Sequence, residues 1–463
     1  MVLDVDGTLL RTDLLFETFW AALSRRFVAT LGATVKNWTK PARLKRELLG
    51  IAAPDIDPLP VHEDVLGLAN SAQQDGRAVC LVSGSDINLV DQVATRFGLH
   101  GPNFGSDGEN NLTGAAKARF LQARFGTGGY DYAGNSGADL HAWAGARRIV
   151  AVAPDRALNQ RLRKLGKPAE VIGQRWGLKS LIQELRPHQW IKNLILFVPM
   201  LATHEFTWSA FGAVSLAAIA FSLAASSIYI LNDLLDLASD RRHPEKCNRP
   251  IAAGALPIQA AMWASLMLSL LALGLALAVG PAVAGLTLIY MLGSLAYSLW
   301  LKKWRWVDVL ALASLFLLRL ITGAAAAMVA LPAILLAFGF VVFFVLACVK
   351  RLTALSRMPK PGHLPGRGYS RSDLGSLRRA AYAGIPGAAL LFLAYAHGPQ
   401  AASLYSAQTV AALAVLPIVA WLFRVVRLSS LGKEDYDPVR FVLHDKTGFV
   451  IALAALALIV LAV

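Results

Sequence analysis

The sequence predicts two architectures in one chain: an α/β domain over residues 1–165 and an all-α membrane bundle of nine helices over residues 187–463. Two observations predict this division. The chain is 56% hydrophobic and only 16% charged, which is too apolar for an ordinary soluble protein of 463 residues. Residues 1–165 hold 19 Lys and Arg against 17 Asp and Glu, whereas residues 166–463 hold 26 against 13 although they are far more apolar. An apolar half with excess positive charge is typical of a membrane domain with basic inner loops.

The predicted membrane half consists of apolar stretches that mostly approach the ~20 residues needed to cross a bilayer. The nine predicted spans are residues 189–204, 209–231, 259–279, 281–299, 306–328, 332–350, 379–396, 406–427 and 446–463. The Lys and Arg residues lie between these apolar runs and not on a polar surface, which argues against a nucleic-acid partner.

Positive charge also predicts how the spans are oriented. If residues 1–186 lie in the cytoplasm and nine spans follow, four loops fall on the outer side of the membrane: 204–208, 280, 329–331 and 397–405. None of these loops contains Lys or Arg. The inner loops contain four (232–258), three (300–305), eight (350–379) and five (424–446). We therefore expect a multi-pass protein of the inner (cytoplasmic) membrane with a cytoplasmic N-terminal domain.

A cluster of acids closes the second predicted span, in the string SSIYILNDLLDLASD. Asn232, Asp236 and Asp240 are spaced i, i+4, i+8 and would form one stripe on a helix, with Asp233 on its flank. Carboxylates on one face repel each other, and a divalent cation with oxygen ligands relieves that repulsion. The sequence therefore predicts that these four residues bind Mg²⁺ and that the three aspartates are catalytic. The alternative is a solvated helix end.

Cationic and polar side chains gather on the same side of the predicted membrane. Four basic residues directly follow the acids and indicate a phosphate site: Arg241, Arg242, Lys246 and Arg249. Others lie at the cytoplasmic ends of spans: Arg186, Lys192, Asn193, Tyr229, Tyr297, Lys302, Lys350 and Arg351. Each cation alone is equally well explained as an anchor that reaches the lipid headgroups. Asp308 and Arg319 lie within the fifth span, where a charge is costly unless it is paired or functional.

Residues 187–463 resemble the UbiA superfamily of intramembrane prenyltransferases, whose mark is an NDxxDxxxD motif, here Asn232 to Asp240. Ordinary members carry a second aspartate-rich motif after the sixth helix, whereas this chain has Lys350 and Arg351 there. The strings RPHQWIKN, NDLLDLASDRRHPEKCNRPIAAG, YSLWLK and VKRLTAL resemble instead the branch of the decaprenyl-phosphate phosphoribosyltransferases. Ala354 departs from that branch, where a glutamate is expected.

This resemblance implies a Mg²⁺-dependent glycosyltransferase with two substrates, phosphoribosyl diphosphate and a polyprenyl phosphate. The donor diphosphate would leave with Mg²⁺, so one acidic site would suffice. The anionic acceptor would need cations where the second acidic motif otherwise lies. Catalysis would then consist mostly of positioning and charge stabilisation.

Four motifs in the first half resemble, in order, those of the haloacid dehalogenase superfamily. They are MVLDVDGTLL with Asp4 and Asp6, VCLVSGS with Ser83, TGAAKARFL with Lys117, and YAGNSGADL with Asp139. The resemblance implies a Rossmann-like α/β fold with a small helical cap over residues 11–75.

The same resemblance implies the roles of these residues. Asp4 would be the nucleophile and Asp6 the general acid/base, with Mg²⁺ held by Asp4, Asp6 and Asp139. Ser83 and Lys117 would bind the transferred phosphate. Asn135 stands where the last motif usually has an acid. An active phosphatase and a retained structural or regulatory domain therefore both remain open.

Residues 166–186 are predicted to be a linker, in which WGLKSLIQEL has the spacing of a helix on a membrane surface. The leading hypothesis for the chain is a polyprenyl-phosphate phosphoribosyltransferase whose fused domain dephosphorylates the product. One alternative is a UbiA-type prenyltransferase with a prenyl diphosphate donor and an aromatic or other small acceptor. Another is a lipid-binding or transport protein regulated by a non-catalytic soluble domain. The missing second acidic motif argues against the former, and the one-sided placement of polar residues argues against transport.

Overall fold

The computed structural model describes residues 1–358, 362–364, 366–432 and 445–463. Parts of the predicted basic loops 350–379 and 424–446 therefore lie outside the described residues. The chain divides into two compact units. Unit 1 comprises Met1–Arg186 and Tyr229–Leu266, and unit 2 comprises Pro187–Ile228 and Met267–Val463. The acidic motif therefore belongs to the same unit as the α/β domain.

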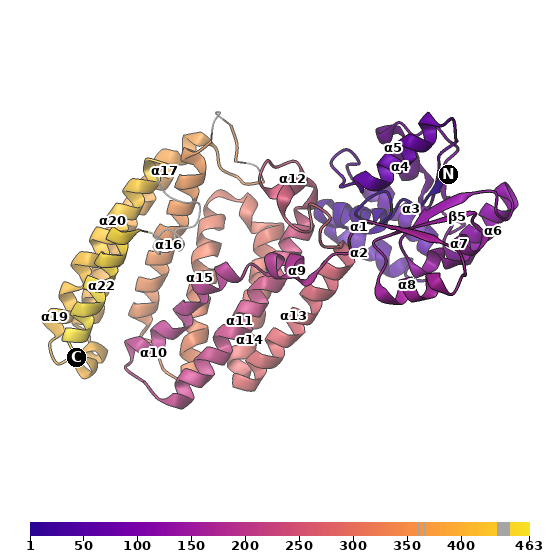
Figure 1. The fold of residues 1–463 in the computed structure, drawn as a ribbon. Helices are drawn as coiled ribbons and strands as arrows, with labels where there is room; N and C mark the ends of the chain where they lie inside the picture. The colour runs from indigo at the N-terminus through magenta and orange to yellow at the C-terminus, as the bar shows by residue number, and fades with distance from the viewer. Residues whose placement is uncertain (359–361, 365, 433–444) are drawn as a thin grey trace. The chain divides into compact units, whose positions relative to one another are not determined.

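A six-stranded parallel sheet forms the centre of unit 1, in the order β3-β2-β1-β4-β5-β6 (Figure 1). Its strands are β1 (Val2–Leu3), β2 (Cys80–Asp86), β3 (Phe104–Ser106), β4 (Asp131–Gly134), β5 (Arg148–Val152) and β6 (Ala169–Ile172). Strand β1 pairs with both β2 and β4, with Val2 opposite Cys80 and Tyr132. The residues that follow these three neighbouring strands therefore meet at one edge of the sheet, which is where a parallel sheet places a site.

Helices cover both faces of this sheet, as its continuous apolar strands require. Helices α4 (Glu63–Gln74) and α5 (Ile87–Phe97) share one apolar core with Leu3 and Leu81. Helices α6 (Gly114–Phe125), α7 (Leu140–Gly145) and α8 (Arg156–Arg163) share a second core with Val2. The α/β architecture predicted for residues 1–165 is confirmed.

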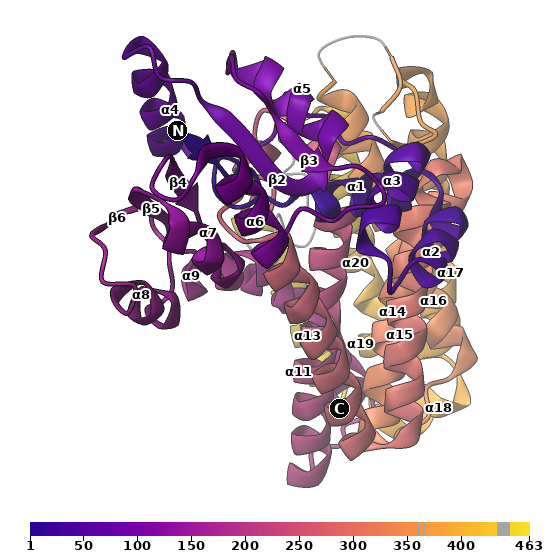
Figure 2. The same ribbon diagram turned by 90° about the vertical axis from the view of Figure 1, so that its right-hand side faces the viewer.

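A small helical cap is inserted directly after strand β1 and the loop that follows it. It consists of α1 (Leu14–Arg25), α2 (Phe27–Lys36) and α3 (Pro41–Ile51), which pack on one another around Ala22, Ala33 and Leu48 (Figure 2). Asp13 caps the first helix, because its side chain accepts hydrogen bonds from the backbone N–H groups of Leu15 and Phe16. The predicted cap over residues 11–75 is thus shorter than expected, since helix α4 packs on the sheet.

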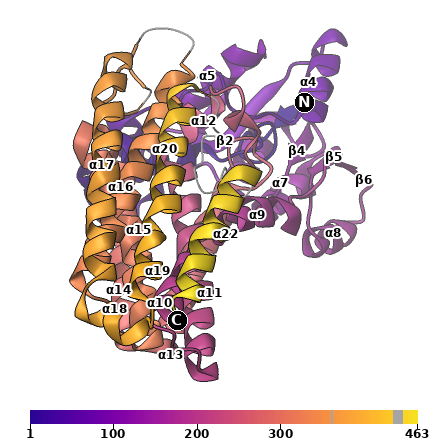
Figure 3. The same cartoon turned by 90° about the vertical axis from the view of Figure 1, so that its left-hand side faces the viewer.

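Seven helices are long and apolar enough to cross a membrane, among the residues that the structure describes. They are Trp208–Leu235 (α11), Ile258–Val279 (α13), Pro281–Leu299 (α14), Arg305–Ala327 (α15), Ala333–Ser356 (α16), Arg371–Ala396 (mostly α17, Leu374–Ala396) and Gln408–Ser430 (α19, Gln408–Leu413, with α20, Val415–Ser430). In unit 2, α16, α17, α20 and α22 (Lys446–Leu461) run side by side (Figure 3). Short elements complete this part of the chain: α10 (Val198–Ala202), α18 (Pro399–Leu404) and several 3₁₀ turns.

The predicted count of nine spans is not confirmed. Residues 189–204 form a 3₁₀ helix, Pro187–Phe197, followed by the short α10. Pro199 lacks a backbone N–H and does not fit the interior of an α-helix, which explains the interruption. The 3₁₀ segment packs closely on α15, because a Cβ atom at Gly323 would overlap the backbone at Leu196. Helix α22 has 16 residues and is shorter than the seven spans.

Candidate functional site

The acidic motif lies in unit 1, at a break between the last residues of helix α11 and helix α12. Helix α11 ends at Leu235, and α12 (Leu237–Arg241) begins after Asp236. The predicted single helical stripe is therefore interrupted. Asn232, Asp236 and Asp240 nevertheless remain one helical turn apart. The backbone N–H of Asp236 donates to the carbonyl oxygen of Asn232, and that of Asp240 donates to the carbonyl oxygen of Asp236, both over 2.9 Å.

Arginine and lysine side chains surround the two buried carboxylates of the motif. Arg249 Nη1 donates to Asp233 Oδ1 over 2.9 Å and also to Asp240 Oδ2. Arg186 donates to the other oxygen of Asp233, and Lys246 Nζ lies 3.4 Å from Asp240 Oδ1. Burial raises the pKa of Asp240, and Arg249 opposes that rise. The motif and its nearest cations thus form one electrostatic cluster, while the predicted phosphate contacts of Lys246 and Arg249 remain predictions.

Two residues on the linker side complete this cluster. The Arg186 guanidinium lies 5.5 Å from the ring centre of Tyr229, a cation–π contact that orients it toward Asp233. Glu184, in helix α9 (Leu178–Leu185), is buried, and burial together with Asp233 raises its pKa to about 9. The sequence reasoning missed Glu184. Its only signal was a charged residue in the amphipathic linker helix two positions before Arg186.

The other two cations after the motif turn away from the acids. Arg241 forms a bidentate ion pair with Glu17 of helix α1, with nitrogen–oxygen distances of 2.8 and 2.6 Å. Its Nε also donates to the carbonyl oxygen of Ala252. Arg242 pairs with Asp55. Both arginines therefore connect the segment after the motif to the α/β domain, which a local sequence pattern could not indicate.

Unit 2 has its own buried ionic cluster at the ends of its helices. Asp308 accepts hydrogen bonds from both Nε and Nη2 of Arg351, from the hydroxyl of Tyr297 over 2.8 Å and from Arg367 Nη1 over 3.0 Å. Asp308 is fully buried and Arg351 nearly so. Arg351, predicted to hold the acceptor phosphate, is thus committed to Asp308.

Asn193 forms a second polar group inside unit 2. Its amide donates to Ser222 Oγ over 2.8 Å, and its oxygen accepts from Arg319 Nε over 3.1 Å. Arg319 also donates to Tyr290 and lies over three aromatic rings. Asn193 therefore forms hydrogen bonds with Ser222 and Arg319, and the predicted phosphate contacts of Lys192, Lys302 and Lys350 remain predictions.

The third cluster lies at the edge of the sheet in unit 1, directly after strands β1 and β4. Lys117 Nζ donates to Asp4 Oδ1 over 2.7 Å and to the Tyr132 hydroxyl over 3.1 Å. Tyr132 in turn donates to Asp139 Oδ1. Burial raises the pKa of Asp4 to about 7, and Lys117 opposes that rise. The motif residues Asp4, Lys117 and Asp139 do meet, as their order in the sequence predicted.

Asp6 and the serines of strand β2 face this cluster. Asp6 Oδ2 accepts hydrogen bonds from Ser83 Oγ over 2.6 Å and from Ser85 Oγ over 2.8 Å. Its other oxygen accepts from the backbone N–H of Leu14. Both serines are buried, and Ser85 lines the cavity. The predicted phosphate contact of Ser83 remains a prediction, and Ser85 is a further candidate that the motif did not indicate.

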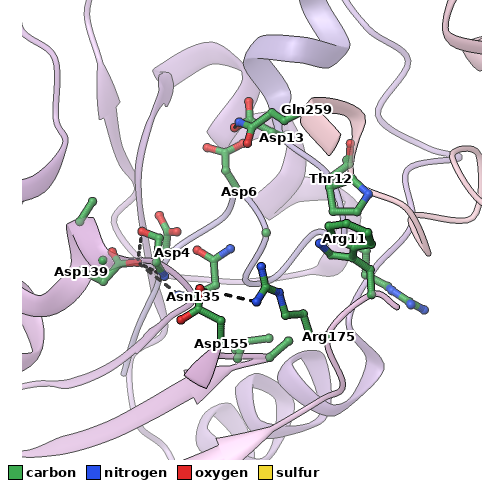
Figure 4. A pocket seen from close by; sticks show the side chains of 18 of the residues that line it. Asp4, Asp6, Arg11, Thr12, Asp13, Asn135, Asp139, Asp155, Arg175 and Gln259 are labelled. Carbon is green, nitrogen blue, oxygen red and sulfur yellow. Dashed lines mark hydrogen bonds and ion pairs between the residues drawn. The ribbon is translucent and has the colours of Figure 1, made fainter. Parts of the chain in front are cut away.

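A cavity of about 920 Å³ opens beside these residues. It is lined by Asp4, Asp6 and Lys117, by Arg175 of the linker, and by the residues that begin helix α13, such as Gln259. Figure 4 shows Asn135 between Asp4 and Arg175. Gly7 has a positive φ of 71°, and a Cβ atom there would overlap the Asn135 amide. The amide therefore packs on the loop that carries Asp4 and Asp6.

The oxygen atoms of the acidic motif and those of the cluster around Asp4 differ in how well they suit a hard cation such as Mg²⁺. No group of three or more His, Cys, Asp or Glu side chains in the described segments is arranged to hold a metal. Within the described residues, Asn232 Oδ1 is nevertheless buried without a hydrogen-bond partner, and Asp240 Oδ1 has only Lys246 Nζ near it, at 3.4 Å, which suits a site where a cation could replace the lysine. Asp139 differs, because Oδ2 accepts from the Asn135 and Ser136 backbone and Oδ1 from Tyr132.

Comparison with known proteins gives a family for the membrane half. The family described as the UbiA prenyltransferase family matches residues 194–444. The chain is 33% identical to "Uncharacterized protein y4nM" of Sinorhizobium fredii, over 99% of this chain and 90% of that protein. It is 33% identical to "Nodulation protein NoeC" of Azorhizobium caulinodans, over 60% of this chain and 91% of that protein. It is 34% identical to the decaprenyl-phosphate phosphoribosyltransferase of Mycobacterium tuberculosis, over 35% of this chain and 56% of that protein.

Solved structures match each half separately. A UbiA homologue from Archaeoglobus fulgidus bound to GPP and Mg²⁺ has a TM-score of 0.45 at 15% identity and covers 60% of this chain and 99% of its own. A substrate-bound phosphoserine phosphatase has a TM-score of 0.26 at 16% identity and covers 35% of this chain and 88% of its own. The family match spans more than half of the chain, from residue 194 to residue 444, and includes the NDxxDxxxD motif. The chain is therefore a multi-pass membrane protein that belongs to the UbiA prenyltransferase family.

Proposed function

We propose that this protein transfers 5-phosphoribose from phosphoribosyl diphosphate to a polyprenyl phosphate at the acidic motif. The observation that carries the proposal is the cluster of Asp233 and Asp240 with Arg186, Lys246 and Arg249. Buried carboxylates that face Arg and Lys side chains suit a diphosphate that arrives with a divalent cation, because the cation can bind the carboxylates while the diphosphate binds the Arg and Lys side chains. The similarity to the decaprenyl-phosphate phosphoribosyltransferase supports the choice of donor and acceptor.

In the proposed reaction, the bond between ribose C1 and the diphosphate oxygen breaks, and an oxygen of the lipid phosphate bonds to C1. Diphosphate leaves, and no proton has to be removed from the acceptor because its oxygen is already ionised at neutral pH. Asn232, Asp233, Asp236 and Asp240 would hold Mg²⁺, which when bound neutralises the leaving diphosphate. Arg249, Lys246 and Arg186 would orient the diphosphate oxygens and stabilise the charge that develops there.

The acceptor phosphate needs positive charge in place of the second acidic motif. Lys350 stands at that position, and its neighbour Arg351 is held by Asp308. We propose that Lys350 and Lys302 attract the lipid phosphate and that Arg351 keeps Asp308 neutralised and the end of its helix in place. We also propose that the membrane is the inner membrane and that the α/β domain faces the cytoplasm, as the distribution of Lys and Arg predicts.

We further propose that the α/β domain removes the phosphate from carbon 5 of the transferred ribose. Asp4 would attack the phosphorus as nucleophile, Asp6 would protonate the leaving oxygen, and water would then release the phosphate from Asp4. Lys117 and Ser85 would hold the phosphate oxygens. The cavity supports this role, because the start of helix α13 lines it together with Asp4 and Asp6. A tethered phosphatase would also act on the product at a high effective concentration.

The test is incubation of the purified protein in lipid nanodiscs with polyprenyl phosphate and radiolabelled phosphoribosyl diphosphate, with Mg²⁺ or with a chelator. We expect a labelled lipid that forms with Mg²⁺ only. Comparison of the wild type with Asp4→Asn tests the second step, since the variant should accumulate the phosphorylated lipid. The same phosphorylated lipid from both proteins would leave the α/β domain with a structural role.

The runner-up is a prenyltransferase with a prenyl diphosphate donor and a small acceptor, which the family name favours. The prenyltransferase hypothesis predicts that the protein releases diphosphate when it is given geranyl diphosphate together with an aromatic acceptor. It also predicts that no label is transferred from phosphoribosyl diphosphate. A regulated lipid-binding protein predicts neither reaction.

A further inference from the structure

The cap helix α2 exposes its large apolar side chains and buries its small ones. Val28, Leu31 and Val35 are spaced i, i+3, i+7 and are 81%, 43% and 79% exposed. Trp38, in the turn after the helix, is 78% exposed and continues this line. These four side chains form the apolar face of α2. The opposite face packs on α1 and α3 through Ala33, so the helix has the reverse of the arrangement usual in a soluble protein.

Helix α2 is too short to cross a bilayer but can lie on one. It has ten residues, about half of the ~20 needed for a span, yet it is one of the shorter apolar helices of the described chain. A helix with aliphatic and aromatic side chains on one face lies in the plane of a membrane surface and buries that face among the lipids. Trp38 suits this depth, because tryptophan is enriched at membrane–water interfaces.

Positive charge around the apolar face favours an anionic lipid surface. Residues 18–46 hold seven Lys and Arg and no Asp or Glu. Lys45 and Arg46 contact strand β2, and the other five are exposed: Arg25, Arg26, Lys36, Lys40 and Arg43. Lys36 forms an exposed ion pair with Glu47. Each Lys or Arg near an anionic membrane adds to the attraction, so this segment is complementary in charge to such a surface.

Contacts inside unit 1 connect the cap to the ends of two membrane-spanning helices. Glu17 of α1 pairs with Arg241, the last residue of α12, which directly follows α11. Asp13 Oδ2, at the start of α1, lies 3.5 Å from Nε2 of Gln259 in the first turn of α13. Helices α11 and α13 are both long and apolar enough to cross a membrane. The cap is therefore held where these two helices reach the membrane surface.

We propose that the apolar face of α2 inserts into the surface of an anionic lipid bilayer and holds the cap there. Leu15 of α1 and Lys45 of α3 line the cavity beside Asp4, so a cap on the bilayer keeps that cavity close to the lipid headgroups. Binding of the bilayer does not depend on the proposed function. The consequence does: the domain would receive a phosphate that is attached to a membrane lipid.

The test places a spin label on the apolar face of the full-length protein in nanodiscs of phosphatidylglycerol and phosphatidylcholine. Val35→Cys carries the label, and Val171→Cys on strand β6, 52% exposed in the native protein, is the matched control. Both proteins also carry Cys247→Ser, since the other two cysteines are buried. Electron paramagnetic resonance compares collisions of the label with oxygen, which enters lipid, and with a water-soluble nickel chelate. We expect oxygen to dominate for Val35→Cys and the chelate for Val171→Cys.

Removal of charge should release the helix. In the labelled Val35→Cys protein with Arg25→Gln and Lys40→Gln, or in discs of phosphatidylcholine alone, we expect the ratio of inserted to free helix to fall by at least about tenfold. Insertion that neither change affects would overturn the choice of an anionic surface. Equal access of the chelate to both labelled positions in anionic discs would overturn the proposal. A face that binds a protein partner or a second copy gives that same result, because each disc holds one copy.

Phosphate release separates this inference from the proposed function. Val28→Ser/Val35→Ser should release phosphate more slowly than the wild type from the lipid-linked phosphoribose and equally fast from soluble ribose 5-phosphate, because only the first substrate lies in the bilayer. If the proposed function fails, the wild type releases phosphate from neither substrate, while the label of Val35→Cys still enters the lipid.

Discussion

Substitution of Glu17 by Ala is expected to loosen the contact between helix α1 of the α/β domain and helix α12 after the acidic motif. Glu17 and Arg241 are each 4% exposed at the side chain and are joined by hydrogen bonds of 2.8 and 2.6 Å. Removal of one partner of a buried ion pair leaves an uncompensated charge and costs about 3–5 kcal/mol. The double variant Glu17→Leu/Arg241→Met removes both charges and should cost far less than the sum of the single variants.

Hydrogen exchange of the amides in helices α1 and α12, followed by mass spectrometry, measures this cost locally. Because about 1.4 kcal/mol corresponds to a tenfold change, a loss of about 3 kcal/mol should speed exchange there roughly 100-fold. Glu170→Ala is the matched control, since its pair with Arg148 is exposed and should contribute no more than about 1 kcal/mol. If the single variants exchange like the control, or if their effects add up in the double variant, the pair does not connect the two helices.

Four further outcomes are expected. Asp233→Asn should abolish label transfer to the lipid, whereas substantial transfer would refute the role of the motif. The variant also loses its pairs with Arg186 and Arg249 and should be less stable, so transfer is measured at a temperature where it stays folded. Lys350→Ala should raise the KM for polyprenyl phosphate more than that for the donor, and Arg351→Met should instead lower stability by about 3–5 kcal/mol, because it leaves Asp308 unpaired. Burial lowers the pKa of His62 to about 4. Between this pH and about 6.5, the imidazole is therefore neutral in the folded protein but protonated in the unfolded chain. Stability should therefore fall as pH drops from about 6.5 to about 4, and His62→Asn should flatten this part of a melting-temperature profile.

The sequence alone was sufficient for features that depend on local pattern. The resemblance of four motifs, among them those with Asp4, Lys117 and Asp139, predicted an α/β fold and assigned these residues to one site, and the structure brings the three side chains together. Seven apolar runs were recognisable as spans because length and hydropathy are local properties. The four residues of the motif from Asn232 to Asp240 also indicated the family, which the family match confirms.

Tertiary structure decided which charged groups are partners, because partners come from distant parts of the chain. Arg241 looked like a phosphate ligand beside the motif, but it pairs with Glu17, 224 positions away. Arg351 likewise pairs with Asp308, which lies on a different helix. No periodicity in one segment encodes such a pairing.

Burial was the second property that only the tertiary structure could decide. Glu184 occupies an amphipathic linker helix and would be expected at a membrane surface, yet it is enclosed beside Asp233. The helical spacing of residues 232–240 likewise did not reveal the break at Asp236, where helix α11 ends and helix α12 begins. The sequence determined which chemical groups are available to this protein, whereas packing determined which of them are buried and which are paired with one another.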